Sequence, residues 1–184
     1  MDLTVYLNKR TLVLGDVNAG KTTFCRAILE AMLREGLGGR IAVIDFAPEI
    51  STAGHDLSDL RGVGGKLLAN NRQEVVWLSD TFIAPRLSSK SEQEALQKAR
   101  DNAVKGVALF KRYSELQRDI LFINDISIFL QGESARRVME STVSAKTIVA
   151  NGYYGEKLGA GALSLRERNE MESLRDHFDN IIML

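Results

Sequence analysis

The sequence is poor in cysteine, histidine and proline, and each scarcity excludes a class of protein. Cys25 is the only cysteine, so no disulfide can form within the chain, and its apolar neighbours in a predicted helix favour a buried, unreactive thiol. The two histidines are far apart in the sequence, which leaves no zinc-binding cluster. The two prolines, Pro48 and Pro85, each follow a predicted strand and indicate loops.

An excess of charge and long apolar runs are missing as well. Lys and Arg number 24 and Asp and Glu number 24, so no overall field favours a nucleic acid or an anionic membrane. No apolar run approaches the roughly 18 residues of a membrane span, and the amino-terminal segment MDLTVYLNKR lacks the apolar core of a signal peptide. We therefore expect a cytoplasmic protein that does not enter a membrane.

What the sequence does contain is an alternation of short and long patterned segments. With 184 residues, 45% of them hydrophobic, the chain can bury one core but is short for two, which predicts a single domain over residues 1–184. Short β-branched runs alternate with helical segments, as in a three-layer α/β fold whose mostly parallel central sheet is flanked by helices. The predicted strands are 11–14, 40–44, 74–78, 120–123, 147–150 and 180–183, with 4–7 as a further edge strand.

Four helices are predicted between these strands. They span about 22–34, 91–116, 133–143 and 165–177. The last of these helices has a clear start signal. Ser164 with Glu167 three residues later matches a capping box, so Ser164 is predicted as the residue that caps this helix.

The strongest chemical signal is a glycine-rich motif between the first strand and the first helix. GDVNAGKTT fits G-x-x-x-x-G-K-[ST], and the strand and helix around it are the context that a P-loop requires. The glycines let backbone amides face the β-phosphate, Lys21 reaches the β- and γ-phosphates, and Thr22 ligates Mg²⁺. The predicted nucleotide-binding residues are Gly15, Asp16, Val17, Asn18, Ala19, Gly20, Lys21, Thr22 and Thr23. The alternative is a plain turn before a helix with Lys21 in solvent.

Two acids complete the predicted P-loop NTPase site. Asp125 follows an apolar strand, which we expect beside the P-loop strand, and is predicted to orient Mg²⁺ through water; Asn124 takes this place if the register shifts by one. Asp45 ends the strand IAVI and is predicted to orient the attacking water or an acceptor hydroxyl, or to complete the metal shell. Lys21, Asp45 and Asp125 are thus the predicted catalytic residues, and Thr22, Asp125 and Asp45 the predicted Mg²⁺ residues. In the alternative, both acids serve only as turn residues.

The succession GDVNAGKTT, helix, IAVID and INDIS resembles the SIMIBI class of P-loop proteins, which includes MinD and ParA ATPases and dethiobiotin synthetase. This resemblance implies that Asp45 acts on the γ-phosphate side. The class's signature lysine is replaced, since Asp16 and Val17 open the loop. The first quarter of the chain is also similar to polynucleotide 5′-hydroxyl kinases, which implies phosphoryl transfer to a nucleic acid.

The base is expected to be adenine, with guanine open, because no Asn-Lys-x-Asp motif is present. The resemblance implies that Asn151 contacts the adenine edge, and Tyr153 or Tyr154 is a candidate to stack on the base. A glycine-bounded turn with partly buried tyrosines is the alternative. ATP, or GTP, together with Mg²⁺ are therefore the predicted cofactors.

A polar segment, 51–66, follows the second strand and contains Arg61 and Lys66. With Arg86 it is a candidate to hold an anionic acceptor or to act as a lid, the alternative being a solvated surface loop. Three functions follow: an ATP-hydrolysing P-loop enzyme, a nucleotide-dependent switch or assembly protein, and a polynucleotide or small-molecule kinase. The acceptor or protein partner is unidentified, and nucleic acid and a second copy of the chain, as a homodimer, stay open.

Overall fold

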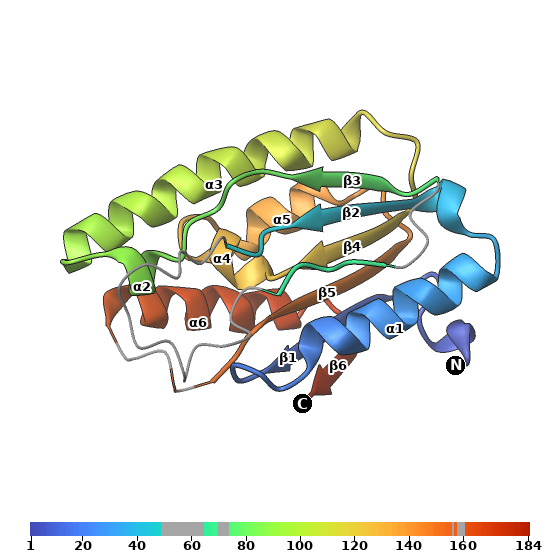
Figure 1. Ribbon diagram of the computed structural model, residues 1–184, viewed down its shortest axis with the longest axis horizontal. Helices are drawn as coiled ribbons and strands as arrows, with labels where there is room; N and C mark the ends of the chain where they lie inside the picture. Colours follow the sequence, from blue (N-terminus) through green and yellow to red (C-terminus); the bar gives the residue numbers. More distant parts are fainter. Residues whose placement is uncertain (49–64, 70–73, 156, 158–160) are drawn as a thin grey trace.

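The computed structural model describes residues 1–48, 65–69, 74–155, 157 and 161–184. Within this part of the chain, six strands form one sheet in which every neighbouring pair is parallel, as the alternating pattern predicts. The sheet order is β3-β2-β4-β5-β1-β6 (Figure 1). The strands are β1 (Arg10–Gly15), β2 (Ile41–Asp45), β3 (Val76–Ser79), β4 (Ile120–Asn124), β5 (Thr147–Tyr153) and β6 (Asn180–Met183).

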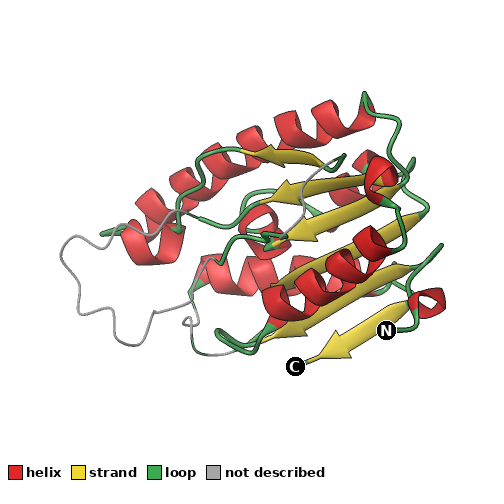
Figure 2. Ribbon diagram, turned by 45° about the vertical axis from the view of Figure 1, so that its right-hand side comes forward, coloured by secondary structure: helices red, strands yellow, loops and turns green. Residues whose placement is uncertain are grey.

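Helices cover both faces of the sheet, which gives the expected three layers (Figure 2). Described helices include none long and apolar enough to cross a bilayer. The α-helices are α1 (Lys21–Arg34), α2 (Pro85–Ser88), α3 (Glu92–Ser114), α4 (Ile126–Leu130), α5 (Ala135–Ser141) and α6 (Ala162–Arg175), with the 3-10 helices η1 (Leu3–Val5) and η2 (Gly38–Arg40).

Two apolar cores separate the layers because successive strand residues point to opposite faces. Val13 of β1 packs with Ile28 and Met32 of α1, whereas Leu12 and Leu14 pack in the other core, which α3, α4 and α6 complete. Both faces of the central strands are therefore buried, as a covered parallel sheet requires. One face of α3 is apolar: Ala99, Ala103 and Phe110 are buried, and Leu96 and Val107 are partly buried.

The predicted edge strand at 4–7 is wrong. This segment begins with the 3-10 helix η1, because the carboxylate of Asp2 accepts hydrogen bonds from the backbone N–H and the hydroxyl of Thr4. The Asp2 side chain thereby closes a turn that competes with extended backbone. The edge beside β1 is instead occupied by β6 from the carboxyl end of the chain.

The predicted order of neighbouring strands is also corrected. The strand that carries Asp125 was expected beside the P-loop strand, but β5 lies between β1 and β4. The end of β5, including Asn151, is therefore inserted between the P-loop and Asp125. Periodicity cannot reveal such an insertion, because it reports which residues form strands and not which strands are neighbours.

The capping box at Ser164 is wrong as well. Helix α6 begins at Ala162, three residues before the predicted start at 165. Its cap is Gly161, and Ser164 lies in its first turn. Glu167, the other half of the predicted box, is 3% exposed and accepts hydrogen bonds from Arg86 of α2 and Gln131 at the end of α4. A tertiary ion pair has thus taken the place of the local cap.

Helices α2 and α4 were missed by the sequence analysis because each is only one turn long. Pro85, taken as a loop marker, is the first residue of α2, where its fixed φ angle and missing N–H are suited to a helix start. Arg86 follows it, so the proline sets the position from which Arg86 reaches Glu167. The cluster of Arg86, Gln131 and Glu167 joins α2, α4 and α6.

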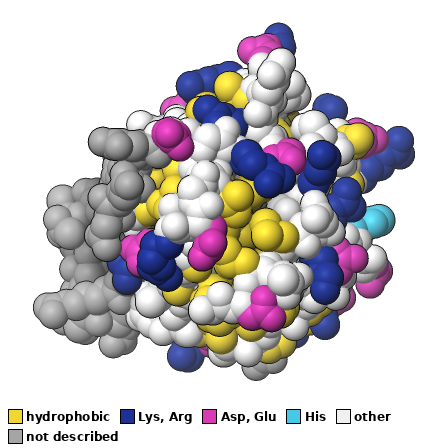
Figure 3. Space-filling view, turned by 90° about the vertical axis from the view of Figure 1, so that its right-hand side faces the viewer, with side chains coloured by type: hydrophobic (Ala, Val, Ile, Leu, Met, Phe, Trp, Pro, Cys, Tyr) yellow, Lys and Arg dark blue, Asp and Glu magenta, His cyan; other side chains and the backbone are white. Residues whose placement is uncertain are grey.

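The opposite end of the molecule, where the strands begin, carries side chains of both signs around apolar ones (Figure 3). Asp119, just before β4, forms ion pairs with Arg40 at 2.8 Å and with Lys146 at 3.7 Å. Arg40 and Lys146 directly precede β2 and β5, so this acid ties three strand starts together. These pairs are exposed, and each contributes little to stability.

Replacement of Gly106 by alanine is expected to lower the free energy of unfolding by about 1–2 kcal/mol, because overpacking outweighs the gain in helix propensity. An added methyl carbon would lie 2.8 Å from Cε2 of Phe129 and 3.0 Å from Cε1 of Phe46, two rings that stack in the core. Urea denaturation measures the change. Val104→Ala, at an exposed position of the same helix, is the control and should change stability by less than about 0.5 kcal/mol.

Glu167 is expected to make the stability depend on pH. Burial raises the pKa of its carboxyl from the ordinary 4.5 to about 7, with Arg86 opposing the shift and Asp125 adding to it. The folded state therefore binds this proton more tightly, so its contribution is complete below about pH 4.5 and is lost as the pH rises through about 7. Relative to the non-titrating Glu167→Gln, the wild type should lose roughly 1–3 kcal/mol between pH 4.5 and 7.5. Parallel stability curves for the two proteins, measured by urea denaturation, would contradict this.

Candidate functional site

The predicted phosphate-binding loop connects the end of β1 to the start of α1. Its two glycines are there for different reasons. A side chain at Gly15 would collide with the carbonyl oxygen of Leu184, 2.6 Å from the added carbon, whereas Gly20 caps α1 with a φ of +91°. A φ in this region is strained for residues that have a Cβ. The loop can therefore turn sharply and begin the helix at Lys21.

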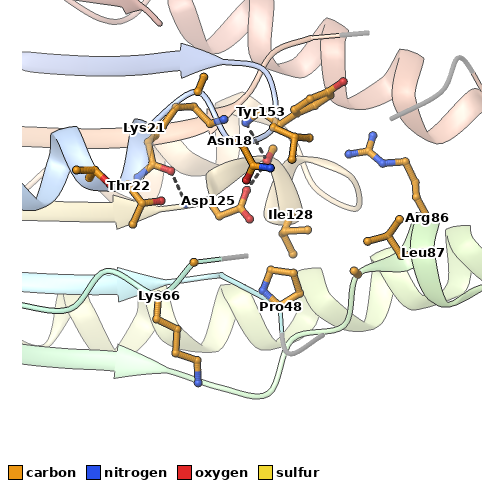
Figure 4. Close-up of a pocket in the computed structure, with 18 of the residues that line it drawn as sticks. Asn18, Lys21, Thr22, Pro48, Lys66, Arg86, Leu87, Asp125, Ile128 and Tyr153 are labelled. Atoms are coloured by element: carbon orange, nitrogen blue, oxygen red, sulfur yellow. Dashed lines mark hydrogen bonds between the residues drawn. The ribbon is translucent and has the colours of Figure 1, made fainter. Parts of the chain in front are cut away.

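The side chain of Lys21 folds back over the phosphate-binding loop. Its ammonium donates hydrogen bonds to the carbonyl oxygens of Gly15 at 3.0 Å and Asp16 at 2.6 Å. Burial lowers the pKa of Lys21, while the negative charges of Asp125 and Asp16 act in the opposite direction. The ammonium is thus held at the loop by two carbonyl oxygens and faces the cavity beside Asp125 (Figure 4).

A buried amide joins residues that the sequence placed in separate segments. Oδ1 of Asn124 accepts from the hydroxyl of Thr22 at 3.3 Å and from Nδ2 of Asn151 at 2.8 Å. Its Nδ2 donates to Oδ1 of Asp45 at 2.7 Å and to the carbonyl of Gly65 at 3.0 Å. The network therefore brings together the predicted residues Thr22, Asp45 and Asn151. Asn124, named above only as an alternative to Asp125, is its centre.

Asp125 directly follows β4 and has a left-handed backbone, with φ 55° and ψ 50°. Its backbone N–H donates to Oδ1 of Asn151 at 3.1 Å, and its carboxylate accepts from the hydroxyl of Ser127 at 2.6 Å. Desolvation raises the pKa of Asp125, with the hydrogen bond from Ser127 and the charge of Lys21 opposing it. The carboxylate lines the same cavity as Lys21 and Thr22. Its role in orienting Mg²⁺ stays a prediction.

Asp45 is placed differently from Asp125. It is 7% exposed, and both of its oxygens already accept hydrogen bonds, from Asn124 and from the backbone N–H groups of Ala47 and Leu67. Burial raises the pKa of Asp45 and these three donors lower it. Among the described residues that line the cavity Asp45 does not occur. It lies behind Asn124, and its predicted catalytic and metal-binding roles stay predictions.

Asn151 is 2% exposed and both ends of its amide are engaged, with Asn124 and with the N–H of Asp125. Its position therefore couples the end of β5 to the predicted Mg²⁺ acid, and the adenine contact that the resemblance implied stays a prediction. Tyr153 donates its backbone N–H to Ser127, while the guanidinium of Arg86 lies 5.5 Å from its ring centre. Tyr154 faces away, between Arg168 and Arg175.

One cavity of about 390 Å³ is lined by five of the residues described above, namely Lys21, Thr22, Asp125, Asn151 and Tyr153. Its first half is the loop from Val17 to Thr23 with Asp125, and its second half lies against α2 and α4. Arg86 and Lys66 line it as the sequence analysis expected of an acceptor side, whereas Arg61 and the segment 51–64 lie outside the described residues. Sequence reasoning gave no role to Ser127, which it quoted only as the last residue of INDIS, or to Gln131, which belongs to no motif; their spacing of four residues was the only further signal.

No cluster of three or more His, Cys, Asp or Glu side chains able to hold a metal ion occurs in the described ranges. A cation at this site would depend on Thr22, Asp125 and oxygens of a bound ligand. That donor set matches Mg²⁺, which is commonly bound by one or two protein oxygens together with phosphate and water.

Comparisons with known proteins concern the fold. No family model matches the sequence, and no curated protein matches it. Among solved structures, the chain is similar to the crystal structure of flagellar accessory protein FlaH from Methanocaldococcus jannaschii. The TM-score is 0.51 at 9% sequence identity, over 97% of this chain and 71% of that chain. The SIMIBI and kinase resemblances stay predictions. The chain has a P-loop NTPase-like α/β fold, with six parallel strands flanked by helices.

Proposed function

We propose that this protein binds a nucleoside triphosphate with Mg²⁺ and hydrolyses it, with ATP preferred. The observation that carries the proposal is the convergence of Lys21, Thr22 and Asp125 on one end of the cavity. These residues come from the start of α1 and the end of β4, which lie more than a hundred residues apart in the chain but at the same edge of the sheet. A plain turn before a helix would not need this convergence.

The charge of the cavity supports an anionic ligand. Its described lining includes four cationic side chains, Lys21, Arg26, Lys66 and Arg86, and one acid, Asp125, in a chain whose formal net charge is +0. Arg86 is already paired with Glu167, so the excess positive charge lies on the side of the phosphate-binding loop. Phosphate oxygens would replace the carbonyl oxygens that Lys21 now contacts, and the amides at the start of α1 would add the favourable end of the helix dipole. The resulting field favours a polyphosphate over a neutral ligand at this end.

Each polar residue has a distinct role in this proposal. Thr22 exchanges its hydrogen bond to Asn124 for a bond to Mg²⁺, and Asp125 orients water in the metal's shell. Asn124 and Asn151 position these two groups, and Asp45 holds Asn124 through the 2.7 Å hydrogen bond. Mg²⁺ would supply charge neutralisation on the β- and γ-phosphates.

Isothermal titration with non-hydrolysable ATP and GTP analogues, with and without Mg²⁺, tests the nucleotide site. The wild type should bind one analogue in a Mg²⁺-dependent manner, and Lys21→Ala should weaken binding at least about tenfold, because a charge-assisted contact is lost. Lys9→Ala, which removes an exposed cation outside the cavity, is the matched control. Absence of binding by the wild type to either analogue would refute the proposal.

Hydrolysis is tested separately by phosphate release. Asp125→Asn should reduce Mg²⁺-dependent turnover by roughly 100-fold or more, since the amide cannot orient the metal's water shell as a carboxylate does. Binding of the analogue without Mg²⁺ should be nearly unchanged. Asp101→Asn, at an exposed position of α3, controls for the loss of one negative charge. Equal turnover in the two variants would exclude a metal-orienting role for Asp125.

A nucleotide-dependent switch is a second candidate because of two hydrogen bonds. The segment that follows 51–64 is hydrogen-bonded to the site: Asn124 donates to the carbonyl of Gly65, and the N–H of Leu67 donates to Asp45. A change at Thr22 on nucleotide binding would reach this segment through Asn124. Hydrogen exchange at the Leu67 amide should then differ between the ADP complex and the complex with an ATP analogue. Identical exchange in both complexes would leave hydrolysis as the sole proposal.

A further inference from the structure

In the proposed site Lys21 contacts the phosphates and Asp125 orients Mg²⁺, and neither of them holds the attacking water. Hydrolysis of a triphosphate needs a group for that water as well. Asp45, which the sequence predicts for this step, accepts hydrogen bonds with both of its oxygens and does not occur in the described lining of the cavity. A side chain that does line the cavity is therefore better placed to contact the water.

Three amide side chains occur among the described residues that line the cavity, those of Asn18, Gln131 and Asn151. An amide can hold a water because its oxygen accepts and its nitrogen donates. Both ends of the Asn151 amide are engaged, and the nitrogen of Gln131 donates to Glu167. The side chain of Asn18 is exposed and has no hydrogen-bond partner in the described part of the chain. Of the three amides, Asn18 therefore keeps both a free acceptor and a free donor.

The backbone of Asn18 is left-handed, with a φ of 62°. Four described residues other than glycine have a positive φ, and two of them, Asn18 and Asp125, line this cavity. Asparagine tolerates this conformation better than most residues do, but glycine adopts it with less strain. Backbone strain of this kind clusters at functional sites. The phosphate-binding loop thus carries a side chain at a position where glycine would be less strained.

Asn18 lies on the phosphate side of the cavity. Lys21 is only three residues later, and its ammonium is hydrogen-bonded to two carbonyl oxygens of the same loop. Figure 4 shows Asn18, Lys21 and Asp125 around one part of the cavity. A terminal phosphate held by Lys21, and by Mg²⁺ beside Asp125, would occupy this part. A neutral amide suits such a neighbour, because a carboxylate would repel the phosphate.

We propose that Asn18 is a catalytic residue whose side-chain oxygen accepts a hydrogen bond from the attacking water and whose nitrogen donates to the terminal phosphate. This inference rests on the proposed function. In the reaction, the water oxygen forms a bond to the γ-phosphorus while the bond from that phosphorus to the β,γ-bridging oxygen breaks. The diphosphate leaves with the electron pair, and the proton of the water passes to the released phosphate. Asn18 transfers no proton and acts by orienting the two reactants.

Asn18→Gly removes the amide but keeps a residue that readily adopts a positive φ, so the loop should retain its conformation. Mg²⁺-dependent turnover should fall about 100-fold, the usual effect of losing one hydrogen bond made in the transition state. Affinity for Mg²⁺-ADP with aluminium fluoride, a mimic of the transition state, should fall by a similar factor. Affinity for a non-hydrolysable triphosphate analogue should change by less than about threefold. Asn8→Gly, at another left-handed asparagine outside the described lining, is the matched control and should change none of these.

Asn18→Asp tests the location of the side chain. The substitution keeps the size of the side chain and its tolerance of a left-handed backbone, but adds a negative charge beside the expected position of the terminal phosphate. It should weaken binding of the triphosphate analogue about tenfold more than binding of ADP, because ADP lacks that phosphate. Equal effects on the two ligands would overturn the placement of Asn18.

The outcomes separate this inference from the proposed function. Undiminished turnover in Asn18→Gly would overturn the inference and leave the proposed hydrolysis in place. Equal loss of affinity for the analogue and for the transition-state mimic would also overturn it, since Asn18 would then act only through the structure of the loop. A wild type that binds the analogue but releases no phosphate would refute the proposed hydrolysis itself, and this role of Asn18 with it.

Discussion

The site depends on the requirement that buried polar groups find hydrogen-bond partners. Asn124 is completely buried at the end of β4, and its amide is engaged on both sides by Thr22, Asp45, Asn151 and the Gly65 carbonyl. Loss of Asp45 or of the Gly65 carbonyl would leave an N–H of this amide without an acceptor in a medium of low dielectric constant. The ends of β2, β4 and β5 and the first turn of α1 are therefore held in one arrangement.

This arrangement determines where the carboxylates of Asp125 and Asp45 lie. Asp125 is the next residue after Asn124, and its left-handed backbone is supported by the hydrogen bond from its N–H to Asn151. The carboxylate consequently turns into the cavity beside Lys21, while Asp45, one strand away, turns behind Asn124. Two acids that look equivalent in the sequence thus have different environments, one lining the cavity and the other supporting the amide that positions it.

The far side of the cavity is held together by a buried ion pair between Arg86 and Glu167. Arg86, Gln131 and Glu167 connect α2, α4 and α6, three helices with no common local motif. Burial of an ion pair is unfavourable unless both partners are well hydrogen-bonded. This cluster therefore positions the three helices more than it stabilises the fold. The cavity therefore has a cationic end formed by a loop and a neutral end formed by packed helices.

The sequence by itself determined the six strands of the sheet, most helices and the presence of a P-loop motif, because periodicity and a glycine-rich motif between strand and helix are local signals. It also identified Lys21, Thr22 and Asp125 as residues of one site, since the carboxyl ends of parallel strands share an edge. Only the tertiary structure decided that β5 lies between β1 and β4, that Asn124 is the centre of the polar network and that Glu167 pairs with Arg86 instead of capping α6. These features depend on contacts between distant segments, where burial and hydrogen-bond satisfaction override the local preference that the sequence displays.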